Sequence, residues 1–152
     1  MSVEGYLDGV QLRKLYLGNK LDRTVSTHLA ATTPYFNIIG GRVLLTGLIG
    51  QIVDAATANA CSWVANPTTG TATQVLCAAL DINPALTGDS LTITGLAADA
   101  MMYGTAAGLG WMERNVPLLI GTLDFIAAAA VGSTIWSVFY VPIDDGAYMT
   151  VA

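Results

Sequence analysis

The 152-residue chain is long enough for one domain with a substantial core, and it does not need disulfides to fold. Only 11% of its residues are charged, compared with about 25% in a typical soluble domain. Because 53% are hydrophobic, a free monomer would expose an unusually apolar surface. We therefore expect other protein subunits to cover part of it.

Charge is divided unevenly along the chain. Residues 1–42 hold five basic and three acidic residues, whereas residues 43–152 hold one basic residue, Arg114, and eight acidic ones. The acidic part is expected to repel nucleic acid. The basic segment suits either an acidic partner surface or a solvated tail. Because the N-terminus MSVEGYLDGVQLRK lacks the basic and apolar regions of a signal peptide, we expect the chain to fold in a cytoplasm.

Residues 1–34 are predicted to form an N-terminal arm, and residues 35–152 a β-rich body. Within the arm, Leu12, Leu15 and Tyr16 have helical spacing, which indicates one short helix or an extended segment. The arm is too short and too polar to build a core alone. We therefore expect contact with another surface to order it.

The body consists of short segments rich in Val, Ile, Leu, Thr and aromatic residues, which are separated by the turn residues Gly, Asn, Pro and Asp. The predicted strands are YFNII, RVLLTGLIGQIV, CSWVAN, TQVLCAAL, SLTITG, a stretch near MMYGTAAG, VPLLIGTLDFIAA and TIWSVFYVPI. Such regular, short segments predict an all-β fold, an antiparallel β-sandwich or a barrel-like body. FIAAAAVG is interpreted as strand despite its helix propensity, and LAADAMM could hold a helical turn.

Two of these segments are apolar on both faces. Residues 42–53 and 134–142 are therefore expected to bury one face in the core and to meet sister subunits with the other. Gly47 and Gly50 indicate a bend, a bulge or a close backbone approach within the first segment. Residues 125–143 lack charge and are long enough for a marginal membrane span, but their Gly, Ser, Thr and Pro content favours a strand. No membrane partner is predicted.

Residues with catalytic or ligand-binding potential are scattered. His28 lies in the polar run STHLAATT, which favours an exposed loop histidine without a catalytic partner. Cys61 and Cys77 have apolar neighbours and are expected to be buried thiols, although a disulfide is possible if their strands pair. The DDG sequence at 144–146 lacks calcium-loop spacing and predicts a turn. We therefore expect no enzyme activity, no cofactor and no metal site.

Four segments, GGRVLLTGLIGQIV, WVANPTTGTATQVLCAALDIN, GDSLTITG and FYVPIDDGAYMTVA, together resemble a group of small virion proteins from tailed bacteriophages. The resemblance spans residues 38–150 and lies mostly in turn sequences, so their shared order is its specific part. The role it indicates is head decoration, also called cement. It implies an all-β body, commonly a homotrimer, on the capsid exterior, often with an N-terminal arm that reaches neighbouring shell subunits. Residues 1–34 are not well covered.

The sequence thus predicts a non-enzymatic virion protein that binds the outside of the head and bridges neighbouring capsid subunits. Its predicted partners are further copies of itself and the major capsid protein. The capsid-facing residues are expected to be Tyr6, Leu12, Arg13, Lys14, Leu15, Tyr16, Lys20 and Arg23. One alternative is a tail or neck component. Another is a carbohydrate-binding β-sandwich on the particle surface, in which Trp63, Trp111 or Tyr148 would have to be exposed.

Overall fold

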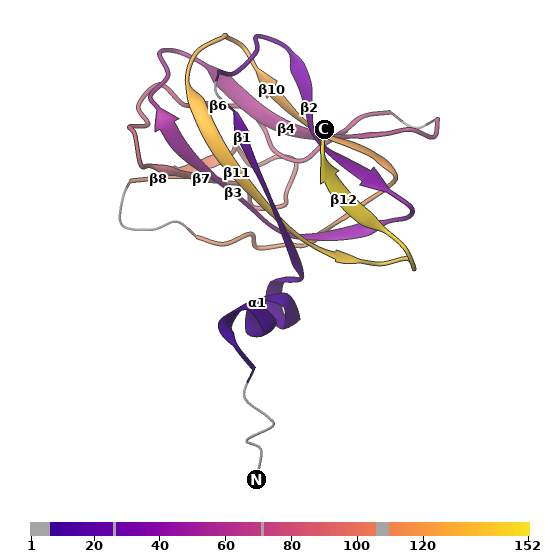
Figure 1. Ribbon diagram of the computed structural model, residues 1–152. Coiled ribbons are helices and arrows are strands. Elements are labelled where there is room, and N and C mark those ends of the chain that lie inside the picture. The colour runs from indigo at the N-terminus through magenta and orange to yellow at the C-terminus, as the bar shows by residue number, and fades with distance from the viewer. Residues whose placement is uncertain (1–6, 26, 71, 106–109) are drawn as a thin grey trace.

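The chain forms a sandwich of two antiparallel β-sheets preceded by one short helix, α1 (Gly9–Leu17) (Figure 1). The computed structural model describes residues 7–25, 27–70, 72–105 and 110–152. Sheet A contains β1 (Asn19–Val25), β3 (Val43–Asp54), β7 (Ser90–Thr92), β8 (Met102–Gly104), β9 (Val116–Leu118) and β11 (Ser133–Pro142). Sheet B contains β2 (Thr32–Ile39), β4 (Ala60–Pro67), β5 (Gln74–Val75), β6 (Leu80–Asp81), β10 (Gly121–Ala127) and β12 (Tyr148–Val151). The predicted all-β sandwich class is confirmed.

The strands of each sheet come from distant parts of the sequence. Sheet A has the order β1-β11-β3-β7-β8, and β9 also pairs with β3. Sheet B has the order β12-β2-β10-β4-β5, and β6 also pairs with β4. The chain repeatedly crosses from one sheet to the other, so neighbouring strands are rarely consecutive. Long-range pairing of this kind is what a sequence pattern predicts least well.

Strand existence was predicted better than strand boundaries. Each predicted segment contains at least one strand, but TQVLCAAL is divided between β5 and β6. β10 ends at Ala127, and residues 128–130 of FIAAAAVG form a bend. In LAADAMM, where a helical turn was considered, residues 97 and 98 form a single turn. The end of the MMYGTAAG stretch lies outside the described residues. Two strands, β1 and β12, were not predicted.

An aromatic cluster joins the two sheets at the centre of the core. Trp63 of β4 and Trp136 of β11 meet edge-to-face, with ring centroids 4.8 Å apart and an interplanar angle of 85°. Phe125 of β10 contacts both rings, at 5.1 and 5.5 Å. All three side chains are almost completely buried. Such pairs contribute beyond their buried area, because the positive edge of one ring meets the negative face of the other.

Gly50 of β3 makes room for this cluster. It lies directly opposite Trp136 in the ladder between β3 and β11. A Cβ atom at this position would lie 2.7 Å from the Trp136 ring. Gly47 has the same relation to a second indole, because its Cβ would lie 2.1 Å from the Trp111 ring. The predicted close approach at these glycines therefore exists, but aromatic rings make it instead of another backbone.

The sequence signatures GGRV and PIDDG meet at one corner of the sandwich. The Arg42 guanidinium donates to both carboxylate oxygens of Asp144, at 2.9 and 2.7 Å, and the Arg42 backbone N–H donates to the same group at 2.7 Å. The bidentate hydrogen bonds from Arg42 lower the pKa of Asp144 to about 2. This pair fixes the β2–β3 loop against the β11–β12 loop.

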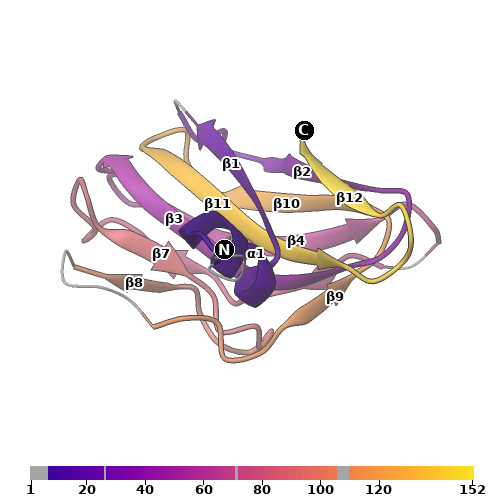
Figure 2. The same cartoon turned by 60° about the horizontal axis from the view of Figure 1, so that its bottom comes forward.

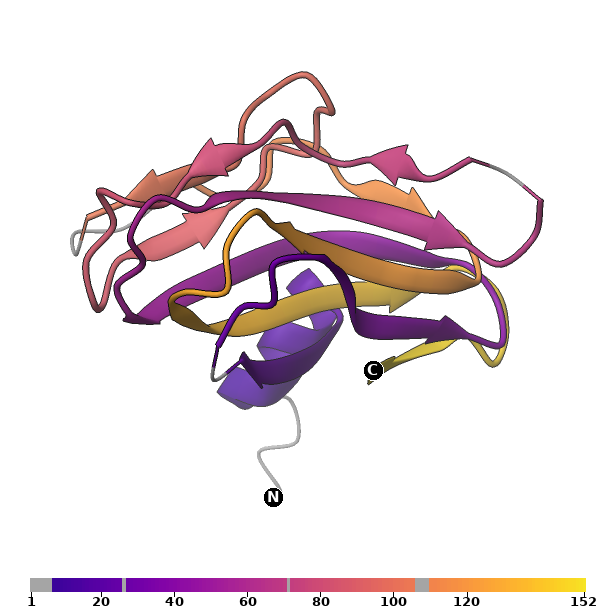
Figure 3. The ribbon, with the colours of Figure 1, turned by 90° about the horizontal axis from the view of Figure 1, so that it is seen from above.

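The sandwich is closed along the edge where β1 and β12 lie side by side (Figures 2 and 3). Arg23 of β1 donates to the carbonyl oxygens of Tyr35 and Ala152 and lies over the Tyr35 ring at 4.6 Å. β1 itself pairs with β11 over seven residues. The predicted arm of residues 1–34 therefore divides in the structure, because residues 19–25 belong to sheet A and the boundary at 34 falls within β2.

The outer face of sheet A is partly covered by the chain itself. Trp111 packs on Gly47 and meets the Phe139 ring edge-to-face at 5.4 Å. Nearby, the Ser137 hydroxyl donates to Asp22. Ile49 and Ile135 are half-buried on this face. Val53 of β3 and Val141 of β11 are more exposed, at 38% and 39%, so apolar positions for the expected contact with sister subunits remain on both strands.

Gly50→Ala is expected to lower the free energy of unfolding by about 1–3 kcal/mol, because the new Cβ displaces the Trp136 indole from the aromatic cluster. Urea denaturation of the purified chain measures this loss. Gly110→Ala is the matched control, since among the described residues, its chain neighbours aside, no heavy atom lies within 4 Å of its added Cβ. Equal losses in the two variants would contradict the role of Gly50.

Candidate partner-binding site

Helix α1 has well-defined ends because its terminal backbone groups are paired. Asp8 caps the N-terminus by accepting from the Gln11 backbone N–H at 2.8 Å. The Gln11 side chain in turn accepts from the Asp8 N–H at 3.0 Å, which completes a capping box. At the other end, the Gly18 N–H donates to the Lys14 carbonyl at 3.0 Å. Local sequence thereby caps the N-terminus of this nine-residue helix and pairs one carbonyl at its C-terminus.

The apolar face of α1 points away from the sandwich. Leu12, Leu15 and Tyr16 are 52%, 77% and 87% exposed, and no residue of the helix is buried. At 100° per residue these three side chains lie within one narrow arc. Arg13 and Leu17, on the opposite side, are half-buried. Figures 1 and 2 show the helix standing off the body next to β1 and β11.

This arrangement reverses the usual pattern of a surface helix, in which the apolar face is the covered one. Isolated helices of this length are marginal in water, so most of their stability comes from packing. The exposed face of α1 has no such packing within the described chain. It is therefore suited to insertion into an apolar groove on another protein, where anchors spaced three and four residues apart provide the contact.

The structure brings together most, but not all, of the predicted capsid-facing residues. Tyr6 lies outside the described residues. The helical ones, Leu12, Arg13, Lys14, Leu15 and Tyr16, share α1. Lys20 instead forms an ion pair with Asp22 at 2.9 Å. Arg23 faces into the fold, where it joins the two sheet edges.

Asp22 links the helix to β1 electrostatically. Partial burial alone would raise the pKa of this carboxyl, but hydrogen bonds from Lys20 and Ser137 and the charge of Arg13 lower it. Arg13 and Lys20, both predicted to face a partner, therefore also act on a carboxylate of the same chain. Their contribution to partner binding is expected to be smaller than that of the exposed apolar residues.

Sequence reasoning missed three residues of this surface. Leu7, which precedes the helix, and Val10, in its first turn, are further exposed apolar residues, at 48% and 53% exposure. Trp111 lies in a pocket of about 190 Å³ that it shares with Tyr16, Leu17, Thr46 and Asn115. Val10 lies two positions before Leu12, about 160° away around the helix at 100° per residue, so the pattern of Leu12, Leu15 and Tyr16 does not extend to it. Trp111 is distant in sequence, and no local signal indicates its contact with the helix.

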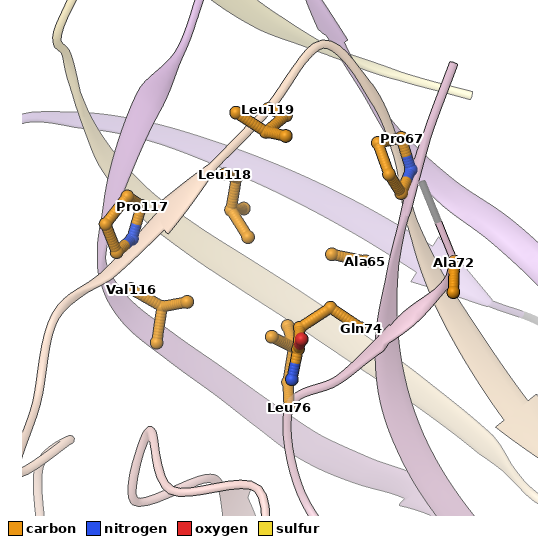
Figure 4. A pocket seen from close by; sticks show the side chains of 9 residues that line it. All are labelled: Ala65, Pro67, Ala72, Gln74, Leu76, Val116, Pro117, Leu118 and Leu119. Carbon is orange, nitrogen blue, oxygen red and sulfur yellow. The ribbon is translucent and has the colours of Figure 1, made fainter. Parts of the chain in front are cut away.

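A second concave region lies between the sheet edges, lined by β4, β5 and β9 (Figure 4). Its volume is about 240 Å³ and its lining is mostly apolar, including Leu76, Val116 and Leu118. Gln74 is the one polar side chain among its described lining residues. The groove holds no ionisable group that could move a proton, so its lining indicates packing and not chemistry.

His28 was predicted to be an exposed loop residue, and this prediction is wrong. Its side chain is fully buried, with Nε2 3.0 Å from the Thr134 hydroxyl and the ring 5.1 Å from that of Phe125. The Asn59 amide nitrogen lies 3.5 Å from Nδ1. Burial lowers the pKa of His28 below its ordinary value of 6.5. The polar sequence around His28 concealed its place between the sheets.

Cys61 and Cys77 are both buried and free, as predicted. Burial raises the pKa of Cys61 to about 12 and that of Cys77 to about 11. Neither thiol is therefore a nucleophile near neutral pH. Within the described residues, no group of three or more His, Cys, Asp or Glu side chains could hold a metal ion. The described part of the chain also contains no helix that is long and apolar enough to span a membrane.

No protein-family model matches the sequence, and neither a curated protein nor a solved structure matches it.

Stability is expected to depend on pH through His28. Because its pKa is lowered in the folded state, the unfolded chain binds more protons as the pH falls below about 6.5. The free energy of unfolding should therefore decline from pH 6.5 towards pH 5, where carboxylates have barely begun to titrate. Urea titrations of the wild type and of His28→Gln at several pH values test this. The same decline in both proteins would contradict the assignment.

Proposed function

We propose that this protein is a non-enzymatic structural component of a tailed-bacteriophage virion, a decoration protein that binds the outside of the capsid. The observation that carries the proposal is α1, which projects from a compact β-sandwich with Leu12, Leu15 and Tyr16 exposed. The order of turn signatures in the sequence and its low charge agree with this role. The proposed partners are the major capsid protein and further copies of the chain.

The proposed mechanism is additive burial of apolar surface. Each 100 Å² of apolar contact contributes roughly 2.5 kcal/mol before the costs of ordering and desolvation are subtracted. A clamp that bridges neighbouring shell subunits must be removed before those subunits separate. Many copies on one shell therefore resist the outward pressure of packaged DNA together, without any catalytic step.

Replacing both anchors, as in Leu15→Ser with Tyr16→Ser, is expected to weaken binding to purified empty heads of the encoding phage. The loss should exceed about tenfold, since each large apolar side chain contributes about 1.5–3 kcal/mol when buried. Pelleting of the full chain with heads measures it. The control is Leu86→Ser, a residue that is 66% exposed but lies outside the helix.

Head binding by the double variant at the wild-type level would show that α1 is not the shell contact. Melting temperatures of both variants should stay close to that of the wild type, because Leu15, Tyr16 and Leu86 are 77%, 87% and 66% exposed. A truncation test should end at residue 17, since a longer deletion also removes β1 from sheet A.

The native mass is expected to be three times the 15.8 kDa of the chain and independent of concentration in the micromolar range. Light scattering or analytical ultracentrifugation at several concentrations measures it. A stable monomer would argue strongly against decoration, because the half-buried apolar positions of sheet A would then have no sister subunit to cover them.

Two other functions make different predictions. A tail or neck component would occur in far fewer copies per virion than a head decoration protein, and quantitative mass spectrometry of particles separates the two. A carbohydrate-binding function is favoured by the pocket between Tyr16 and Trp111, which also has the Asn115 side chain. Trp63, by contrast, is fully buried and cannot stack on a sugar. A glycan array tests this function directly.

A further inference from the structure

Helix α1 is attached to sheet A through a β-bulge in β3, from which a side chain bonds the C-terminal end of the helix. We propose that Thr46 and Trp111 are positioning residues, which fix the direction in which α1 presents its apolar face. This inference rests on the proposed function of that face as the shell contact. Neither residue is proposed to provide the main contact with the shell.

Thr46 is the extra residue of a β-bulge. In the ladder between β3 and β11, Gly47 is paired with Phe139 and Leu45 with Tyr140, so Thr46 has no partner of its own. Bulges re-aim side chains and often lie near functional sites. Here the Thr46 side chain points at the end of α1, where its hydroxyl donates to the Leu17 carbonyl oxygen.

This hydrogen bond pairs a group that a helix cannot pair internally. The last four carbonyls of any α-helix lack intrahelical donors. In α1 the Gly18 N–H bonds the Lys14 carbonyl, and Thr46 bonds the Leu17 carbonyl from the sheet. Thr46 is only 7% exposed. Its bond with Leu17 is therefore partly buried, which limits the competition of water for both groups.

Trp111 holds the bulge in place. Its indole Nε1–H donates to the Thr46 carbonyl oxygen at 2.9 Å. The ring lies on Gly47, where no side chain intervenes, and meets Phe139 edge-to-face. The indole is thus fixed by a hydrogen bond, a backbone surface and a second ring. Trp111 is nevertheless 38% exposed. Burial in the core therefore does not by itself account for the three contacts that fix its ring.

The chain leaving the helix is a second point of attachment. Gly18 has φ 84°, and a Cβ atom there would lie 2.1 Å from the Tyr140 carbonyl oxygen. The backbone is therefore pressed against β11 one residue after the Leu17–Thr46 bond. Two attachments so close together restrict rotation of α1 relative to the sandwich. A helix that is oriented before binding loses less conformational freedom when it binds.

The orientation can be measured without any partner. Spin labels placed at Lys14→Cys and Thr87→Cys in the full chain report the distance from helix to sandwich. The buried native thiols, whose pKa values are raised, should stay unlabelled in the folded protein. We expect a narrow distance distribution that broadens in Thr46→Val, which removes the hydroxyl donor and keeps the side-chain shape. It should also broaden in Trp111→Phe, which removes the indole N–H and part of the ring surface on Gly47. Thr46→Ser keeps the hydroxyl and should restore the narrow distribution.

Head binding then tests the link to function. Thr46→Val is expected to weaken binding to empty heads about fivefold, as the loss of one hydrogen bond of about 1 kcal/mol implies, and Thr46→Ser should restore it. An unchanged distance distribution in both Thr46→Val and Trp111→Phe would overturn the positioning role. Broadening without any loss of head binding would instead show that the helix is positioned but is not the shell contact. Absence of binding by the wild type would overturn the proposed function alone.

Discussion

The contact between Trp63 and Trp136 is the interaction on which the two-sheet architecture depends. It joins β4 to β11 across the interior, and Phe125, Tyr35 and His28 are arranged around it. The buried indole N–H groups of both tryptophans lack partners in the described structure, a cost of about 1–3 kcal/mol for each such group. The sandwich tolerates this because the aromatic surface buried here is large and well packed.

The sequence indicated the class of fold because strand signals are local. Alternation in SLTITG, the β-branched residues of β3 and β11, and the turn residues between them are each readable within a few positions. Pairing is not local. Arg42 and Asp144 are 102 residues apart, and nothing near either one shows that GGRV and PIDDG build a single corner. The two sequence signatures are therefore linked by one ion pair, which only the three-dimensional structure shows.

The candidate site was predicted in part for the same reason. The helical spacing of Leu12, Leu15 and Tyr16 is local, and the structure places them on one face. β1 was missed because Lys20, Asp22 and Arg23 gave it the composition of a solvated arm. The alternation expected of a strand was nevertheless present, because Leu21, Arg23 and Val25 lie on the same side of β1. The guanidinium of Arg23 faces inward, and two carbonyl oxygens and the Tyr35 ring stabilise its charge there.

The pairing of β1 with β11 also has a mechanical consequence. α1 is joined to the beginning of β1 through Gly18, so a force that pulls on the helix enters the sandwich lengthwise along that strand. β1 is paired with β11 from Asn19 to Val25, and ladder bonds lie perpendicular to the strand axis. Such a load shears all of them at once instead of opening them one after another. The attachment can therefore hold tension that would unzip a strand pulled from its side.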